Sequence, residues 1–313
     1  FFTMQTGIPG IVEDGTAYLL ICCVGSFGMF FVITLEKLLQ STGKTVYSMI
    51  TQIVGALINI VMDPIMIFGL FVFPRMGVAG AALATILGQI ISAVLALYFN
   101  VKYNKDIHIQ FRGFRPDFSI IKRIYAVGIP SIIMTSIGSV MNFGMNKILI
   151  SFTSTATAVF GVYFKLQSFV FMPVFGLNNG MVPIIAFNYG AKKKHRITET
   201  IKRCLIINFC IMAAGTLVFW IFHDAMLMMF NATPAMLEMG RIALRVISLS
   251  FPFAAISIVL SGSFQALGKG MYSLLMSIVR QLLFLLPSAW LLAKFLGLNA
   301  IWWSFPLAEI SSI

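Results

Sequence analysis

Long apolar runs alternate with short polar or charged connections along almost the whole chain. We searched for stretches of about 20 apolar residues, the length at which a helix crosses the hydrocarbon core of a bilayer. Nine candidate spans result: 16–36, 46–73, 78–99, 119–150, 155–187, 202–222, 242–264, 272–296 and 299–313. Nearly all are too long for strands, and the alternating segments of a β-barrel are absent, so only helices fit a lipid environment. The pattern predicts an all-α polytopic membrane protein, with the lipid bilayer as its first partner.

Composition and charge agree with this architecture. Apolar residues make up 59% of the 313 residues and charged residues only 10%, against about 25% charged in soluble domains, which excludes a soluble enzyme. Of the 22 lysines and arginines, 15 lie in alternate connections, within 37–44, 102–123 and 192–203 and at 269. The positive-inside rule makes that side cytoplasmic. The net charge of +12 is then mostly a matter of topology, and no nucleic-acid partner is expected.

The chain repeats itself at an offset of 225 residues. Segments 9–57 and 234–282 share 14 identities without a gap, among them Q-x-x-G-K-x-x-Y-S at 40–48 and 265–273. A further match at offset 220 pairs Gly77 with Gly297. Six expected spans separate the two copies, and an even number gives both the same orientation, so the repeat is parallel.

This repeat predicts two six-helix lobes. The second copy is preceded by three expected spans (119–222) whose first-half counterparts would lie before residue 1. We therefore expect nine of twelve spans here, with the first three helices outside this sequence and the last span cut short. Residues 1–117 would be the second half of the N-terminal lobe with the cytoplasmic loop between the lobes. Residues 118–313 would be the C-terminal lobe.

One carboxylate lies deep inside an expected span. Most acidic residues lie at span ends, but Asp63 lies well inside 46–73. A charged side chain at the bilayer centre costs about 2.5–3.5 kcal/mol on insertion scales, so such residues usually have a partner or a function. Gln52 and Asn59 precede Asp63 on the same helical face, and Pro64 should free the carbonyl of Ile60, a potential Na⁺ ligand. The alternative is a neutral, hydrogen-bonded Asp with a structural role.

The next expected span repeats the polar spacing with Thr85, Gln89 and Ser92. Two adjacent antiparallel helices would then present facing polar stripes in an otherwise apolar lobe. We expect Gln52, Gln89 and Ser92 to line a substrate cavity. Glu309, paired with Gln89 by the repeat, is a further candidate for a cavity residue.

Several motifs resemble those of one transporter family. These are L-L-Q-S-T-G-K-T (38–45), N-I-V-M-D-P-I-M-I-F-G (59–69), G-V-A-G-A-A-L-A-T (77–85), G-I-P (128–130) and N-N-G-M-V-P-I-I-A-F-N-Y-G-A-K-K (178–193). In order along the chain, they resemble multidrug and toxic compound extrusion (MATE) transporters, and the Asn-x-x-x-Asp pattern resembles the DinF-type bacterial branch.

The resemblance implies a function. Family members export cationic amphipathic compounds in exchange for H⁺ or Na⁺, by alternating access between two six-helix lobes. It also implies that Asp63, Asn59 and Thr85 form the cation-coupling site. We expect no cofactor beyond the coupling ion, no metal site, no catalytic residues, a monomer, and a multi-pass location in the inner (plasma) membrane.

Other interpretations remain open. Lys165 and Arg280 lie deep in expected spans, and basic cavity walls would suit an anionic substrate, so a lipid-linked oligosaccharide flippase of the same superfamily is the alternative function. Glu36 stands beside Lys37 near a span end, where a local ion pair is expected rather than a transport role. An intramembrane enzyme would need paired catalytic groups at membrane depth. A channel would more often arise by oligomeric symmetry than from a two-lobed repeat.

Overall fold

The computed structural model describes residues 9–71, 73–107 and 115–312. All regular secondary structure within these ranges is helical, as expected. The chain divides into two compact units, residues 1–114 (unit 1) and 115–313 (unit 2), and each is described separately.

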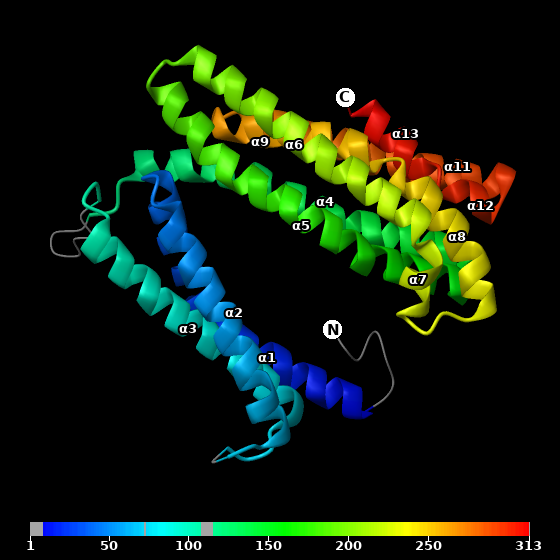
Figure 1. Ribbon diagram of the computed structural model, residues 1–313, viewed down its shortest axis with the longest axis horizontal. Coiled ribbons are helices and arrows are strands. Elements are labelled where there is room, and N and C mark those ends of the chain that lie inside the picture. The colour runs from blue at the N-terminus through cyan, green and yellow to red at the C-terminus, as the bar shows by residue number, and fades with distance from the viewer. Residues whose placement is uncertain (1–8, 72, 108–114, 313) are drawn as a thin grey trace. The chain divides into compact units, whose positions relative to one another are not determined.

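Unit 1 is a three-helix assembly of α1 (Pro9–Ser41), α2 (Thr45–Phe68) and α3 (Gly77–Tyr103). Helix α3 packs extensively against both α1 and α2, which contact each other much less (Figure 1). Every fourth residue of α3 is buried and most are small: Gly80, Ala84, Gly88, Ser92, Ala96 and Asn100. Small side chains at this spacing form a flat stripe along a helix and let neighbouring backbones approach closely in a membrane.

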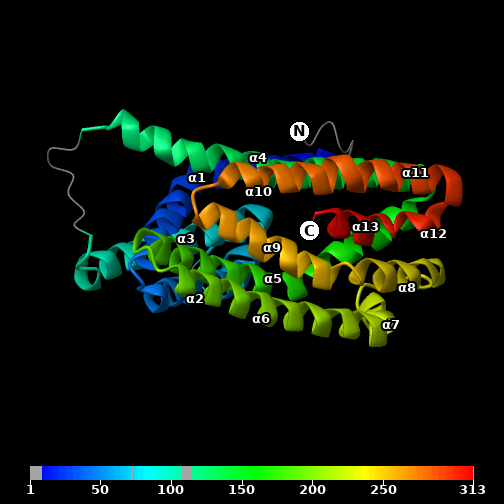
Figure 2. The ribbon, with the colours of Figure 1, turned by 90° about the horizontal axis from the view of Figure 1, so that it is seen from above.

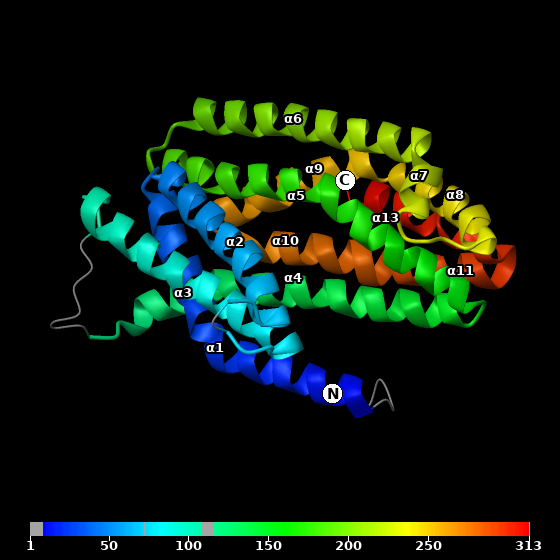
Figure 3. The same cartoon turned by 60° about the horizontal axis from the view of Figure 1, so that its bottom comes forward.

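Unit 2 contains the remaining helices. They are α4 (Phe118–Ile150), α5 (Ser154–Gly190), α6 (Lys194–Ile221), the short α7 (His223–Met228), α8 (Pro234–Ser248), α9 (Phe251–Ala266), α10 (Gly270–Ile278), the π-helical segment η2 (Val279–Leu285), α11 (Leu286–Leu296), α12 (Leu298–Ile301) and α13 (Ser304–Ser311). Helices α10, η2 and α11 continue one another alongside α4 (Figure 2). Helix α6 lies along α5 (Figure 3) and also contacts α9. The aromatic side chains of Phe160, Phe219, Phe251 and Trp302 are fully buried in the core of this unit.

The structure confirms the polytopic helical architecture and refines two of the expected spans. Within the described residues, seven helices are long and apolar enough to cross a membrane, counting Gly270–Leu296 as one. The expected span 242–264 is instead a pair, α8 and α9, bent by 45° between Ser248 and Phe251. Pro252 lies in the first turn of α9, where a residue without an N–H readily begins a new helix. The expected last span, 299–313, consists in its described part of α12 and α13, each shorter than a membrane crossing requires.

The sequence repeat corresponds to one repeated turn. Gly43 and Gly268 have φ angles of 77° and 74°, a left-handed conformation that glycine adopts without steric cost. The same hydrogen bonds surround both: Lys44 N–H donates to the carbonyl of Leu39 at 2.8 Å and Lys269 N–H to that of Phe264 at 2.8 Å. The repeated segment therefore forms the same turn in both copies, although α1 is unbroken where its counterpart is divided into α8 and α9.

Candidate functional site

A buried carboxylate joins α1 to α2 inside unit 1. Glu36 is only 8% exposed. Its Oε1 accepts a hydrogen bond from Thr51 Oγ1 at 2.8 Å, and its Oε2 accepts one from Gln52 Nε2 at 2.9 Å. Each oxygen thus has a donor from the facing helix, which is how a carboxylate can remain in a largely apolar environment.

The prediction of a local pair between Glu36 and Lys37 is wrong. Lys37 Nζ donates instead to Gln40 Oε1 at 3.0 Å on an exposed face. Consecutive residues of a helix point in different directions, whereas residues three or four apart share a face. Glu36 therefore faces the interior of unit 1 and Lys37 faces outward.

The three residues expected to couple the cation lie together. Asn59 Nδ2 lies 3.3 Å from Asp63 Oδ1, one turn further along α2, and 3.3 Å from Thr85 Oγ1 on α3. The Thr85 hydroxyl donates to the carbonyl of Ala81 at 3.0 Å. All three side chains are partly buried. Asn59 thus bridges the carboxylate to the neighbouring helix, and α2 continues as a helix through Pro64.

Helices α1, α2 and α3 together line an open pocket of about 310 Å³, which we call the acidic pocket. It is lined by Val32, Glu36, Gln52, Gly55, Ala56, Asn59, Thr85, Gly88, Gln89 and Ser92. Ser92 Oγ donates to the carbonyl of Thr51 at 3.1 Å and fixes α3 against α2. None of these lining residues is Lys, Arg or His, while Glu36 lies in the wall and Asp63 is bonded to Asn59. Carboxylate, amide and hydroxyl oxygens grouped around one pocket are suited to binding a cation.

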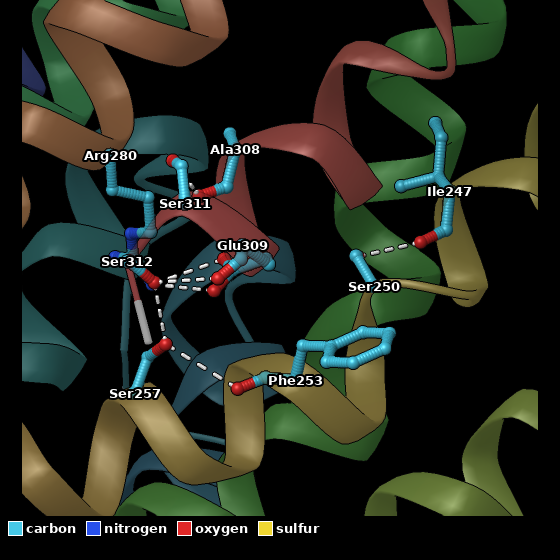
Figure 4. Close-up of polar contacts among 9 residues, drawn as sticks. All are labelled: Ile247, Ser250, Phe253, Ser257, Arg280, Ala308, Glu309, Ser311 and Ser312. Atoms are coloured by element: carbon cyan, nitrogen blue, oxygen red, sulfur yellow. Dashed lines mark hydrogen bonds and ion pairs between the residues drawn. The ribbon is translucent and has the colours of Figure 1, made fainter.

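The remaining predicted cavity residue, Glu309, lies in unit 2. Its two carboxylate oxygens are 3.1 Å and 3.3 Å from Arg280 Nη1, and Figure 4 draws this pair beside Ser312 and Ser257. Arg280 stood out in the sequence only as a deep basic residue. The structure shows that its charge is compensated by Glu309.

A signal in the sequence could have predicted the contact between Glu36 and Thr51. Glu36 lies seven residues before Gly43 and Thr51 eight residues after it. A helical hairpin that turns at Gly43 brings residues at such similar distances from the turn opposite one another. Reading the Gln-x-x-Gly-Lys turn as a hairpin would therefore have matched Glu36 with Thr51.

Comparison with known proteins identifies the family. The MatE family model matches residues 1–65 and 130–291. The chain is 28% identical to the multidrug export protein MepA of Staphylococcus haemolyticus and to that of Staphylococcus aureus, over 90% of this chain and 60% of each relative. It spans about 60% of the length of these curated relatives.

Solved structures of transporters have a similar fold. A multidrug resistance MATE family transporter in an outward-facing conformation matches with a TM-score of 0.91 over 99% of this chain and 69% of that one. A MOP superfamily transporter from Pyrococcus furiosus also reaches 0.91, over 99% of this chain and 70% of that one. Both are 24% identical to this chain, so these likenesses show the fold. The match over most of the sequence, together with this fold, confirms the resemblance seen in the motifs: the chain belongs to the MatE family.

Proposed function

We propose that the protein is a multidrug efflux antiporter of the plasma membrane. It exports cationic amphipathic compounds in exchange for H⁺ or Na⁺, by alternating access. The similarity to the multidrug export proteins MepA supports this proposal, and so does the helical MATE fold. We propose no catalytic step, because transport requires only that the protein bind and release its cargo.

The acidic pocket is the observation that carries the proposal. It lies within helices that are long and apolar enough to span a membrane, and its wall contains the Glu36 carboxylate and several amide and hydroxyl oxygens. A negative site with low-dielectric walls attracts cations strongly, because protein surroundings screen charge less than water does. An apolar wall contributed by residues such as Val32 suits the hydrophobic part of an amphipathic cation.

In this mechanism Asp63, Asn59 and Thr85 couple the two fluxes. A proton or Na⁺ that enters from outside neutralises the Asp63 carboxylate, and the local potential then no longer favours a bound organic cation, which leaves. Loss of that ion on the cytoplasmic side restores the negative site. Asn59 transmits the change, because its amide is bonded both to Asp63 and to Thr85 on the next helix.

The alternative, a flippase for lipid-linked oligosaccharides, is less well supported. Such a substrate carries a pyrophosphate and requires a cavity with free positive charge. Arg280 lines one pocket of unit 2 and is paired with Glu309. Lys147 and Lys294 line another pocket of unit 2, from exposed positions in the last turns of α4 and α11. Lys165 is exposed, with its Nζ 5.8 Å from the ring centre of Phe230. Cation export therefore remains the better proposal.

The test is ethidium transport in proteoliposomes under imposed pH or Na⁺ gradients. The wild-type protein is expected to move ethidium against its gradient when one of these ions flows the other way. Glu36→Gln should weaken ethidium binding about tenfold or more, the loss expected on removing one charged interaction. Glu199→Gln makes the same chemical change at an exposed pair with Arg203 and should leave transport unchanged. Ethidium movement that ignores both gradients would contradict antiport.

A further inference from the structure

Unit 2 contains a second cavity, of about 260 Å³, which we call the ion-pair pocket. It occupies the position in the repeat that corresponds to the acidic pocket. Lining residues of the two pockets correspond at an offset of 225 as Val32 and Ser257, Glu36 and Ser261, Gln52 and Ser277, Gly55 and Arg280, and Ala56 and Gln281; at an offset of 220, Ser92 corresponds to Ser312. The two copies of the repeat therefore each line a pocket at corresponding positions.

The chemistry of the two pockets differs. Ser261 replaces the Glu36 carboxylate, Arg280 replaces Gly55, and Glu309 stands where the offset of 220 places Gln89. Arg280 and Glu309 form an ion pair at 3.1 Å, with side chains 22% and 16% exposed. The acidic pocket has a negative wall, whereas the positive charge in the wall of the ion-pair pocket, Arg280, is neutralised by Glu309, which is bonded to Arg280 but does not itself line the pocket.

The helix that carries Arg280 has an unusual form. Residues Val279–Leu285 are π-helical, a rare conformation that is often found at functional sites because it redirects side chains. Here consecutive residues, Arg280 and Gln281, both line the same pocket. Their counterparts Gly55 and Ala56, in the regular helix α2, likewise both line the acidic pocket, but neither is polar.

Hydrogen-bonding capacity in the ion-pair pocket is unused. Asn178 Oδ1 is buried and has no hydrogen-bond partner among the described residues. Gln265 Nε2 has the Met134 thioether sulfur at 3.8 Å, a weak acceptor. Its repeat counterpart, Gln40, donates instead to Ser48 Oγ at 2.9 Å. An unpaired buried polar atom is rare in folded proteins and is available to bond to water or to a ligand that enters the site.

We propose that the ion-pair pocket binds compact zwitterions, molecules in which a carboxylate and an ammonium lie close together, as in an amino-acid head group, with an apolar tail. The ligand carboxylate would form an ion pair with Arg280, and the ligand ammonium would form one with Glu309. The unused groups of Asn178 and Gln265 would bond to the head group. This site is additional to the cation export proposed above, and binding measurements test it without reference to transport.

Charge balance explains this preference. A simple cation or anion that opened the pair would satisfy one of its charges and leave the other buried without a partner, which is strongly unfavourable. A zwitterion replaces both partners at once. Met134, Phe175, Ile258 and Met276 supply an apolar wall for the tail. The volume lies just below the roughly 300–1,000 Å³ of drug-sized sites, which suits a small head group with a short tail.

Three fluorescent probes on one scaffold test the proposal. Nε-dansyl-L-lysine carries a free ammonium and carboxylate, its methyl ester carries only the ammonium, and its Nα-acetyl derivative carries only the carboxylate. Dansyl fluorescence titrations use the full chain in detergent. The zwitterion is expected to bind about tenfold or more tightly than either derivative, the effect of one charge-assisted hydrogen bond. Equal binding of all three probes, or no saturable binding of the zwitterion, would overturn the proposal.

Variants show whether the pair itself is responsible. Arg280→Gln leaves a lone carboxylate and should shift the preference to the methyl ester. Glu309→Gln leaves a lone guanidinium and should shift it to the acetyl derivative. If either single variant fails to fold, the double variant Arg280→Gln with Glu309→Gln has no unpaired charge and should fold without any preference among the probes. A zwitterion preference that survives in the double variant would refute the role of the pair.

Discussion

Gly80 lies where α3 crosses the backbone of α2, and its replacement by alanine tests the close packing that holds the cation-coupling residues together. A Cβ at this position would lie 2.5 Å from the Met66 carbonyl oxygen and 2.7 Å from its carbonyl carbon. Ordinary contact begins at 3.4 Å, so the helices must separate locally by almost an ångström. Neither neighbouring atom can rotate away, because both belong to the α2 backbone.

The expected cost follows from three terms. Overpacking costs about 1–3 kcal/mol, and the higher helix propensity of alanine returns about 1 kcal/mol. The hydrogen bond from Asn59 to Thr85 is already 3.3 Å long, so a small separation breaks it and removes about 0.5–1.5 kcal/mol. We expect a net destabilisation of roughly 0.5–3.5 kcal/mol, together with impaired transport.

The measurement is the midpoint of thermal unfolding in detergent, followed by far-ultraviolet circular dichroism, because all four tryptophans lie in unit 2. The matched control is Gly161→Ala on α5, where no atom lies within 4 Å of the added Cβ, and it should unfold at or slightly above the wild-type temperature. If Gly80→Ala unfolded no lower than Gly161→Ala, the close approach of α2 and α3 would be wrong.

Two further predictions concern charged pairs in unit 2. Arg241 donates to both carboxylate oxygens of Asp224 at 2.6 and 2.8 Å and thereby lowers the pKa of Asp224. A lowered folded-state pKa stabilises the fold above the unfolded-state value of about 3.9 and loses this effect as the pH falls through the folded pKa. Asp224→Asn should thus unfold slightly earlier than wild type at neutral pH and equally at strongly acidic pH, and a difference that persists in acid would contradict this. Arg280→Met should lower the free energy of unfolding by about 3–5 kcal/mol because Glu309 loses its partner. Adding Glu309→Leu should recover most of this loss. Equal unfolding midpoints for the single and double variants would contradict a compensated pair.

The sequence predicted the spans well because membrane-spanning helices can be recognised by their length and apolar composition. The expected 119–150 and 155–187 correspond closely to α4 and α5. It could not predict the bend between α8 and α9, since the apolar run continues through it and only Pro252 marks it. The pattern of apolar positions also does not predict the π-helical segment at Arg280.

In the candidate site, too, residues that share a helix face were predicted from the sequence, whereas contacts between helices were not. Asn59 and Asp63 share a helix face at four-residue spacing, and the facing stripe on the next span supplied Thr85, so helical periodicity alone brought these residues together. Contacts between helices were harder to predict. Glu36 was assigned to its neighbour in sequence although its donors lie 15 and 16 residues away. Arg280 and Glu309 are 29 residues apart, and only packing of η2 against α13 joins them.

The central claim is that Asp63 couples ion entry to the export of organic cations. Its most direct test is ethidium efflux from proteoliposomes, driven by a pH or Na⁺ gradient, for Asp63→Asn. The control is Asp106→Asn, the same change at an exposed residue beyond the end of α3. We predict that Asp63→Asn abolishes gradient-driven efflux while Asp106→Asn retains the wild-type rate. Wild-type efflux by Asp63→Asn would contradict the account.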